Sequence, residues 1–368
     1  FSEGSSTMKA HLMALLAVAL PALEALAAPP ARPTAQLRVA QQGPPPVVEH
    51  RGDYDPAPAP NEYFDEGCNT CAQPDNCCRD YGRLSAGYAF VLVQPHREDD
   101  LAFTRTVDDG TFIGTSDATF NQDLDLSPRV WLEYGRTNGL GAKVTYWQFD
   151  HASEVVSGSP SAVQVETLQT PVFRGLSLAT SNPNETLFAQ SDIDIDVLDF
   201  EGVKWTDFCC WRLGTTAGIR HAEITQGYQA LRFNAAGAAA SLLNSRHNFD
   251  GVGPTFSVEG RRAFGPLQFY SMARGSLLYG NGSLAFTRVE DIDTAAPLTN
   301  QVNFNRNDVL TVAEIQVGLE WHRECCNGNM FFVRTAMEGQ VWQGVGSAIS
   351  EDGDLGFFGF NIALGMSL

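Results

Sequence analysis

Charged side chains of both signs occur at alternate positions inside several apolar segments of this chain. In residues 309–321, Ile315 and Val317 share one parity, while Glu314 and Gln316 share the other. Because successive side chains of a β-strand point to opposite faces, such a segment has one apolar and one polar face. Carboxylate and guanidinium groups that share a face either attract and select ions or neutralise one another. The charged positions identified in this way are Arg129, Glu133, Asp199, Glu201, Arg220, Glu259, Arg261, Arg274, Glu314, Arg334 and Glu338.

The histidines are the other residues that could carry out acid–base chemistry. An enzymatic barrel would need clustered Asp and His, or a serine with a histidine, at one rim of the fold. The chain has no G-x-S-x-G nucleophile motif. We therefore expect no catalytic residues, and we interpret the histidines that stand near an aspartate as solvated loop residues. These pairs are His96 with Asp99, His151 with Asp150, and His247 with Asp250.

Two groups of carboxylates could bind calcium or another divalent cation, because such ions prefer oxygen ligands. Neither group has the spacing of a complete EF-hand loop. We expect solvated acidic surfaces, with no metal and no cofactor. The groups are Asp192, Asp194 and Asp196, and Glu351, Asp352 and Asp354.

The cysteines allow either redox or metal chemistry. Cys68 and Cys71 form a C-x-x-C motif, but Ala72 follows where covalent haem attachment requires histidine. A zinc knuckle would need a second well-spaced pair, which adjacent Cys77 and Cys78 do not supply. An even number of cysteines in an oxidising compartment favours disulfides. The candidates are Cys68, Cys71, Cys77, Cys78, Cys209, Cys210, Cys325 and Cys326.

The beginning of the sequence has the pattern of an export signal. Met8 and Lys9 precede an apolar run that extends to Leu20, and Ala25-Leu26-Ala27 has the small-x-small pattern of a cleavage site. We interpret residues 1–27 as an upstream extension followed by a signal peptide. A membrane anchor is the alternative, but the apolar run is short for a spanning helix.

The rest of the chain divides into three parts. Residues 28–63 are rich in Pro and Ala, which predicts a disordered segment, and residues 64–83 form a cysteine-rich segment expected in the periplasm. After the signal there is no stretch of 18 apolar residues, so residues 84–368 could enter a membrane only as a closed barrel. The chain has a net charge of -19, which excludes binding to nucleic acid phosphates.

The elements that must position the charged residues are strands of an all-β, antiparallel transmembrane up-and-down barrel. Alternating segments are joined in turn by short turns and long polar loops, which is the rhythm of an outer-membrane barrel with its short turns in the periplasm. We expect about ten strands, and a hairpin within a long loop would make twelve. The predicted strands are 84–95, 126–136, 141–151, 191–204, 211–225, 249–262, 267–285, 307–322, 330–343 and 356–368.

The segment 191–204 does not follow one pattern. Ile193 and Ile195 share one parity, whereas Leu198 and Phe200 share the other. Either a bulge near Val197 shifts the register, or the aspartates of this segment lie above the membrane on the outer side.

Whole-strand patterns from Tyr88 to Leu368 resemble the pore-forming outer-membrane family typified by the Legionella major outer membrane protein. The similar segments are AGYAFVLVQPH, SDIDIDVLDFEG, AGIRHAEI, FDGVGPTFSVEGRR, ARGSLLYG and the closing GFNIALGMSL. The resemblance implies pore formation in the bacterial outer membrane. The CC pairs are not part of the family pattern.

We therefore expect a porin-like channel that passes ions or small solutes through a charged lumen. The alternative is a non-conducting structural or surface-binding barrel of the envelope, because ten strands leave little room for an aqueous path. The expected partners are outer-membrane lipid, the machinery that inserts barrels, and other envelope proteins.

We predict that all eight cysteines lie on the periplasmic side, because none falls in a long loop. Bonds between distant segments are expected rather than bonds between adjacent cysteines, which are strained. Peptide mapping of the unreduced protein should give cross-linked peptides that join these segments. Free thiols throughout, or labelling of these cysteines from the cell exterior, would contradict the prediction.

Overall fold

The computed structural model describes residues 84–97, 100–136, 138–208, 211–292, 294–324 and 329–368. Fifteen strands and no helix occur in these ranges. No helix of the described part has the length and apolar character to cross a membrane.

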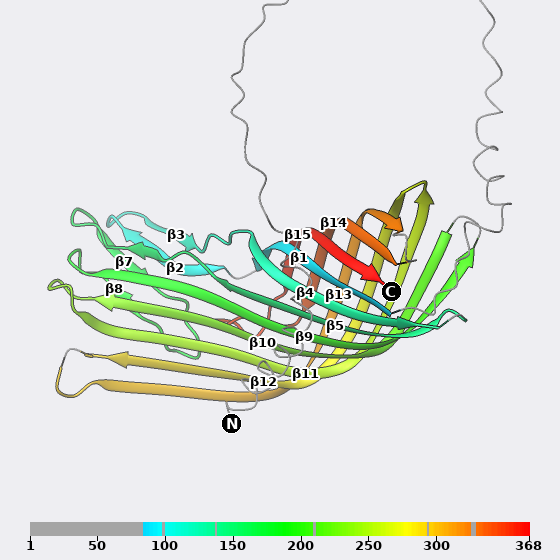
Figure 1. Ribbon diagram of the computed structural model, residues 1–368. Helices are drawn as coiled ribbons and strands as arrows, with labels where there is room; N and C mark the ends of the chain where they lie inside the picture. Colours follow the sequence, from blue (N-terminus) through cyan, green and yellow to red (C-terminus); the bar gives the residue numbers. More distant parts are fainter. Residues whose placement is uncertain (1–83, 98–99, 137, 209–210, 293, 325–328) are drawn as a thin grey trace, which may run out of the picture. The chain divides into compact units, whose positions relative to one another are not determined.

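The largest sheet contains eleven strands, and all of them except β6 form a closed antiparallel ring, which leaves ten strands in the wall (Figure 1). The ring closes because β1 pairs with β15 and β9 pairs with β10. In order around the ring, the strands are β1 (Leu84–Arg97), β4 (Asp125–Gly135), β5 (Leu140–Ala152), β9 (Thr186–Phe208), β10 (Trp211–Phe233), β11 (Ala239–Phe264), β12 (Leu267–Glu290), β13 (Leu298–Glu324), β14 (Met330–Gln343) and β15 (Leu355–Ser367).

The remaining strands lie in two of the long connections. The connection between β1 and β4 holds β2 (Leu101–Asp108) and β3 (Ile113–Thr119), and the connection between β5 and β9 holds β6 (Val156–Gly158), β7 (Val165–Gln169) and β8 (Ala179–Thr180). Strands β3, β2, β7 and β8 pair into a second, four-stranded sheet, while β6 pairs with β9. The predicted loops therefore do contain hairpins, but these do not enter the wall, so twelve strands is wrong and ten is confirmed.

Two other predicted loops are shorter than expected. Residues 226–248 and 286–306 are mostly strand, because β10, β11, β12 and β13 continue well beyond the predicted ends. In the extension of β13 the exposed positions are Gln301, Asn303, Asn305 and Asn307, so this segment lacks the apolar outer face by which the other strands were recognised. We call this end of the barrel, shared with the second sheet, the long-loop end and the opposite end the short-turn end.

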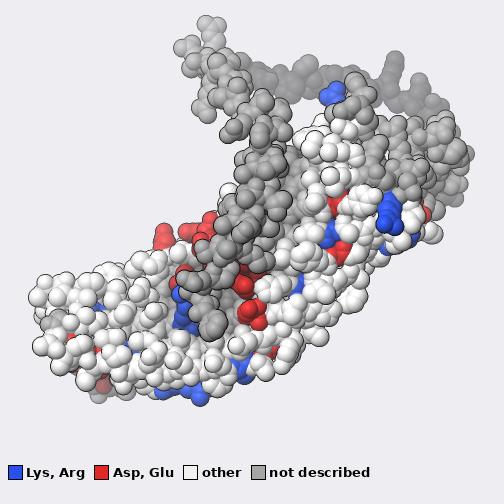
Figure 2. All heavy atoms as spheres, turned by 60° about the horizontal axis from the view of Figure 1, so that its bottom comes forward, with Lys and Arg blue, Asp and Glu red and all other residues white. Residues whose placement is uncertain are grey.

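Side-chain alternation holds around the wall. On β13, Ile315 is 57% exposed and Val317 42%, whereas Glu314 and Gln316 are buried. Uncharged side chains cover most of the face shown in Figure 2. The predicted assignment of outward and inward faces for 309–321 is confirmed, and the apolar outer face is the one expected to meet lipid.

The segment 191–204 contains no bulge. The pairing of β9 with β10 and with β5 runs without a register shift, so one parity faces inward along the whole strand. Ile193 and Ile195 are therefore buried inside the barrel, and Asp192 and Asp194 face outward. Of the two alternatives left by the sequence, the structure excludes the bulge. The position of the aspartates above the membrane stays a prediction.

The turn between β4 and β5 shows how the short-turn end is built. Gly139 has φ of 77°, a left-handed conformation that glycine adopts without strain. A side chain there would also lie 2.5 Å from the carbonyl oxygen of Trp205. The amide of Trp205 in turn donates to the Gly139 carbonyl at 2.8 Å, so this turn is fixed against β9.

The register leads to a stability prediction for β13. Replacing Ile315 with Arg places a guanidinium on the outer wall, where a charge near the bilayer midplane costs about 2–4 kcal/mol. Replacing Gln316 with Arg places the same group in the polar interior and should cost much less. Unfolding of both variants in lipid vesicles by urea measures the difference. Equal costs would show that the outer wall does not meet lipid.

Candidate functional site

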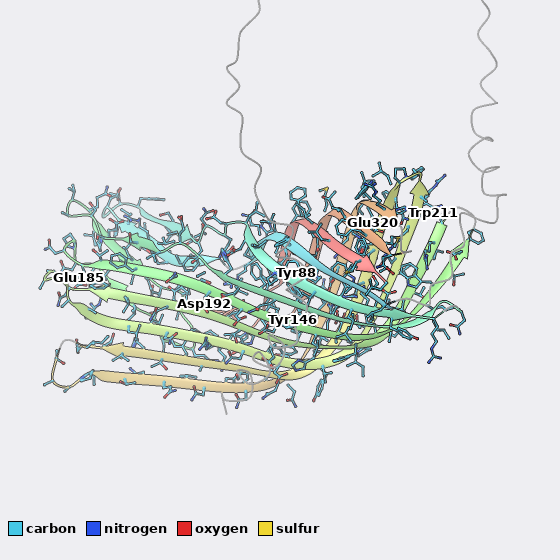
Figure 3. The ribbon with its side chains drawn as sticks, in the orientation of Figure 1. Tyr88, Tyr146, Glu185, Asp192, Trp211 and Glu320 are labelled. Carbon is cyan, nitrogen blue, oxygen red and sulfur yellow. The ribbon has the colours of Figure 1, made fainter. Side chains whose placement is uncertain are left out.

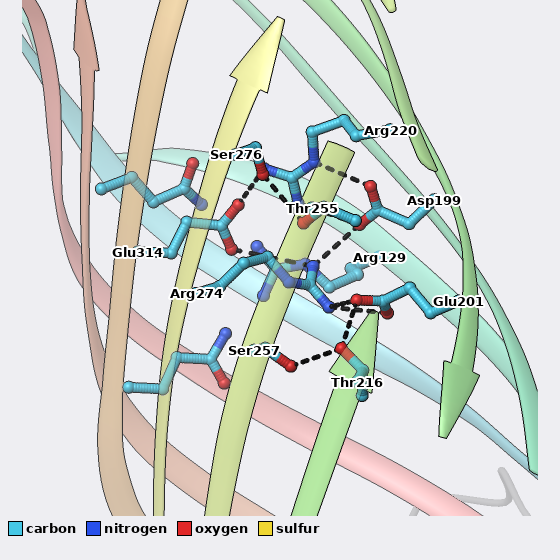
Figure 4. A network of polar contacts seen from close by, with 12 residues as sticks. Arg129, Asp199, Glu201, Thr216, Arg220, Thr255, Ser257, Arg274, Ser276 and Glu314 are labelled. Carbon is cyan, nitrogen blue, oxygen red and sulfur yellow. Dashed lines mark hydrogen bonds and ion pairs between the residues drawn. The ribbon is translucent and has the colours of Figure 1, made fainter. Parts of the chain in front are cut away.

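Ion pairs fill the barrel interior between its middle and the short-turn end. Arg220 of β10 donates two hydrogen bonds to Asp199 of β9, at 2.7 and 2.9 Å, and a third to Glu314 of β13 (Figure 4). Arg274 of β12 bridges Asp199 at 2.8 Å and Glu201 at 2.8 and 3.0 Å. This group joins strands that are not neighbours in the ring, so it crosses the lumen.

A second group lies on β11, β13 and β14. Arg261 donates to Glu259 at 2.6 Å and to Glu320 at 3.3 Å. Arg334 also donates to Glu320, at 2.6 and 2.9 Å, and its guanidinium lies 3.8 Å from the centre of the Tyr270 ring. Glu320 thus accepts from two arginines, which compensates the cost of burying its charge.

Arg129 and Glu338 form a third, bidentate pair across the lumen, at 2.6 and 2.9 Å. Glu338 also accepts hydrogen bonds from Gln316, Gln340 and Asn361. A carboxylate with this many donors is held in one orientation. The interior therefore has fixed charges and not a set of freely moving side chains.

A cavity of about 110 Å³ lies among these groups. It reaches the short-turn end, where Gly135 and Gly139 flank the turn between β4 and β5. Its lining includes Lys143, Trp205 and Tyr270 together with charged residues of all three groups. We call this cavity and its lining the charged vestibule.

An apolar layer separates the charged vestibule from the long-loop end. Phe149, Ile195 and Ile224 lie directly opposite one another on β5, β9 and β10, and all three point inward. From the other side, Trp342 stacks on Trp147 with ring centres 6.3 Å apart. The layer is defined by the buried residues Val91, Trp147, Phe149, Ile195, Ile224, Phe249, Val312, Trp342 and Phe357.

The long connections close the lumen beyond the apolar layer. Tyr228 donates to the carbonyl of Ala102 at 2.6 Å, and Gln226 donates to the carbonyl of Gly346 at 3.0 Å. Both bonds tie connecting segments to the inner face of β10. Burial in this region raises the pKa of Asp100, which accepts a hydrogen bond from Gln122 at 3.1 Å.

Figure 3 shows the two ends of the barrel, with Glu185 at the long-loop end and Trp211 at the short-turn end. The structure places every charged position named from the sequence on the inner face between the middle and the short-turn end. It brings all of them into the three groups above except Glu133, which instead accepts a hydrogen bond from Trp205 at 2.8 Å. The sequence-based list omitted Glu320 and Lys143. Glu320 stands in the same alternation as Glu314, so the signal was present.

The apolar layer is the part of the site that the sequence analysis missed. Alternation predicted a polar inner face, but inward positions near the middle of the wall carry aromatic and branched side chains. The mixed parity of Ile195 and Leu198 on β9 was the available signal. The apolar residues change from the inward parity at Ile195 to the outward parity at Leu198, because the inner face of this unbroken strand changes from apolar to charged.

The interpretation of the histidines near aspartates as solvated loop residues is wrong for His151 and His247, which lie in strands β5 and β11 with inward-facing side chains. His151 points inward and Asp150 outward, so the wall separates them, and His151 instead contacts Asp125 at 3.1 Å and Gln122 at 2.9 Å. His247 and Asp250 are likewise on opposite faces. Asp99 lies outside the described residues.

One group on the outer wall could hold a metal ion. The potential ligand atoms of His221, Glu223 and Asp250 all lie within 4.8 Å of one another, and His221 Nε2 is already 2.9 Å from Asp250. The eight cysteines proposed for disulfides, and the segments 1–27, 28–63 and 64–83, lie outside the described residues.

A closed antiparallel wall with an apolar outer face and a charged interior defines a membrane-spanning β-barrel of the outer-membrane class. Residues 82–347 match the family described as Legionella pneumophila major outer membrane protein precursor. The chain therefore belongs to this family, and it is a protein of the bacterial outer membrane. The resemblance found in the sequence is confirmed.

Solved structures with similar folds have low sequence identity to the chain. The outer membrane protease OmpT from Escherichia coli gives a TM-score of 0.39 with 9% identity, covering 78% of this chain and 96% of its own. The CymD monoaromatic hydrocarbon channel gives 0.28 with 7% identity, covering 83% and 93%. The Pseudomonas putida toluene transporter TodX gives 0.25 with 6% identity, covering 82% and 91%. No curated protein matches the sequence.

The charge groups predict a strong dependence of stability on Arg220. Replacing Arg220 with Met removes the donor shared by Asp199 and Glu314 and leaves these two buried carboxylates with Arg274, at 2.8 and 4.0 Å. Removing one partner of a buried ion pair in this way costs about 3–5 kcal/mol. The matched control is Arg246→Met, because Arg246 is exposed on the outer face of β11. Urea unfolding in vesicles measures both. A loss for Arg220→Met no larger than for the control would contradict the structural role of the pairing.

Proposed function

We propose that the protein is an outer-membrane channel for ions and small solutes, which the apolar layer closes in the conformation described here. The observation that carries the proposal is the charged vestibule, which reaches the short-turn end and stops at the apolar layer. Hydrophobic constrictions of this kind close pores by excluding water. No catalytic step is part of the proposed role.

The residues of the interior favour a lumen through which solutes pass over a lumen that is merely filled by side chains. Replacing buried ion pairs with well-packed apolar residues is often neutral or stabilising. The barrel already fills its middle with apolar side chains, so it could have filled the vestibule in the same way. Charged side chains around an open volume are instead the lining expected of a path for hydrated solutes.

The contacts within the layer indicate where the path would open. Trp147 stacks on Trp342 and packs edge-on against Phe357, with ring centres 5.9 Å apart. Arg129 lies 5.7 Å from the Trp147 ring centre, so this tryptophan forms the boundary between the layer and the vestibule. Movement of these indole rings would connect the vestibule with the interior at the long-loop end.

A second candidate function is a non-conducting barrel that serves the envelope as a structural or surface-binding protein. The observation that favours it is the filling of the lumen at three successive levels, by paired charges, the apolar layer and the connecting segments. Ten strands give a narrow barrel, close to the size that side chains fill completely.

Conductance in planar bilayers separates the two functions. We expect the wild-type protein to give small, intermittent current steps and the double variant Trp147→Ala/Trp342→Ala to give larger and longer ones, because the apolar layer then has a gap. The matched control, Trp321→Ala, removes an indole from the outer wall and should behave as the wild type does. Silent membranes with both the wild type and the double variant would support the non-conducting barrel.

A further inference from the structure

We infer that the charged vestibule prefers small anions, although the whole chain carries a net charge of -19. This inference rests on the proposed channel function and names the class of ion that the channel accepts. Seven residues of the lining are Arg or Lys and three are carboxylates, namely Glu133, Glu259 and Glu314.

Two of the ion pairs present their cationic partner to the cavity, whereas in the pair of Arg220 with Glu314 the carboxylate lines it. In the pair of Arg129 with Glu338, the arginine side chain is 12% exposed and the carboxylate 0%. Arg334 is 10% exposed and Glu320 1%. In these two pairs the carboxylate is absent from the cavity lining and the arginine belongs to it. A small ion that enters therefore meets mainly positive groups at short range.

Arg274 extends this pattern. It is 8% exposed, whereas its partners Asp199 and Glu201 are 2% and 0% exposed. Both carboxylates are absent from the cavity lining, and Arg274 belongs to it. Positive and negative charges are nearly balanced in the interior as a whole, but the cationic groups outnumber the carboxylates seven to three in the lining of the cavity.

Lys143 adds a positive charge that forms no ion pair with the described residues. It lies opposite Glu133 and Glu201 on the neighbouring strands, and it lines the vestibule. No hydrogen bond or ion pair within the described part of the chain involves its ammonium group, whereas Glu133 accepts from Trp205 at 2.8 Å. An entering anion is the natural partner for this ammonium.

The part of the vestibule nearest the short-turn end is also lined by cationic side chains. The guanidinium groups of Arg212 and Arg261 each lie 4.9 Å from the centre of the Trp205 ring. Both arginines and the tryptophan belong to the lining. An anion approaching from the short-turn end therefore passes two guanidinium groups before it reaches Lys143.

Reversal potentials in a KCl gradient test the inference. The wild-type channel should pass chloride in preference to potassium, and Lys143→Glu should lower the chloride-to-potassium permeability ratio by about threefold, because two unit charges change beside the path under partial salt screening. Lys143→Gln should give a smaller change in the same direction. The matched control is Lys204→Glu, since Lys204 is exposed on the outer face of β9 and donates to Asn138 at 2.7 Å. Its ratio should equal that of the wild type.

These currents distinguish failure of the inference from failure of the proposed function. A conducting wild type that prefers potassium, or equal effects of Lys143→Glu and Lys204→Glu, would overturn the anion preference and leave the channel intact. Absence of current from every variant would overturn the channel.

A fluorescence measurement tests the vestibule without requiring conduction. The difference in emission between the wild type and Trp205→Phe isolates Trp205, and iodide and caesium quench it from solution as anion and cation. We expect steeper quenching by iodide, with the preference reduced by Lys143→Glu and unchanged by Lys204→Glu. Equal quenching, or steeper quenching by caesium, would overturn the inference whether or not the barrel conducts.

Discussion

Closure of the wall between the first and last strands is the constraint on which the rest of the structure depends. β1 and β15 pair without interruption from Ser85 opposite Ser367 to Arg97 opposite Leu355. Once the ring is closed, each wall residue faces either outward or into one narrow lumen. Charged residues of distant strands, such as Arg129 and Glu338, are thereby forced within reach of one another. Charged side chains can stay buried in the lumen only when they form ion pairs, because an unpaired buried charge is strongly destabilising.

Closure also divides the lumen into layers along the barrel axis, each lined by residues of several strands. Strand pairing places Phe149, Ile195 and Ile224 at one height and Asp199 opposite Arg220 at another. The change from charged to apolar lining thus occurs around the ring and not on a single strand. A solute from the short-turn end meets fixed charge first and a water-excluding layer next, which is the order that a closed channel requires.

Net charge describes such a molecule poorly. The chain carries -19, yet arginines and a lysine outnumber carboxylates in the lining of the vestibule, because several of the carboxylates that pair with them are absent from the lining, among them Asp199 and Glu338. Several of the remaining carboxylates, including Asp192 and Asp250, are on the outer wall. Because nearby charges dominate the energy of an ion in a narrow path, the lining and not the total decides which ions are favoured.

The sequence by itself determined the strand count, the antiparallel order and the inward position of residues such as Glu314 and Arg334, because the alternation of side chains in a strand is a local property. It also identified the family. It could not determine that Arg220 pairs with both Asp199 and Glu314, since those partners are set by closure of the ring. The apolar layer was hidden for the same reason: Ile195 and Trp342 are ordinary strand residues until the barrel places them at one level across the lumen. The local sequence pattern determines whether each side chain points inward or outward, and the tertiary structure determines which residues it contacts.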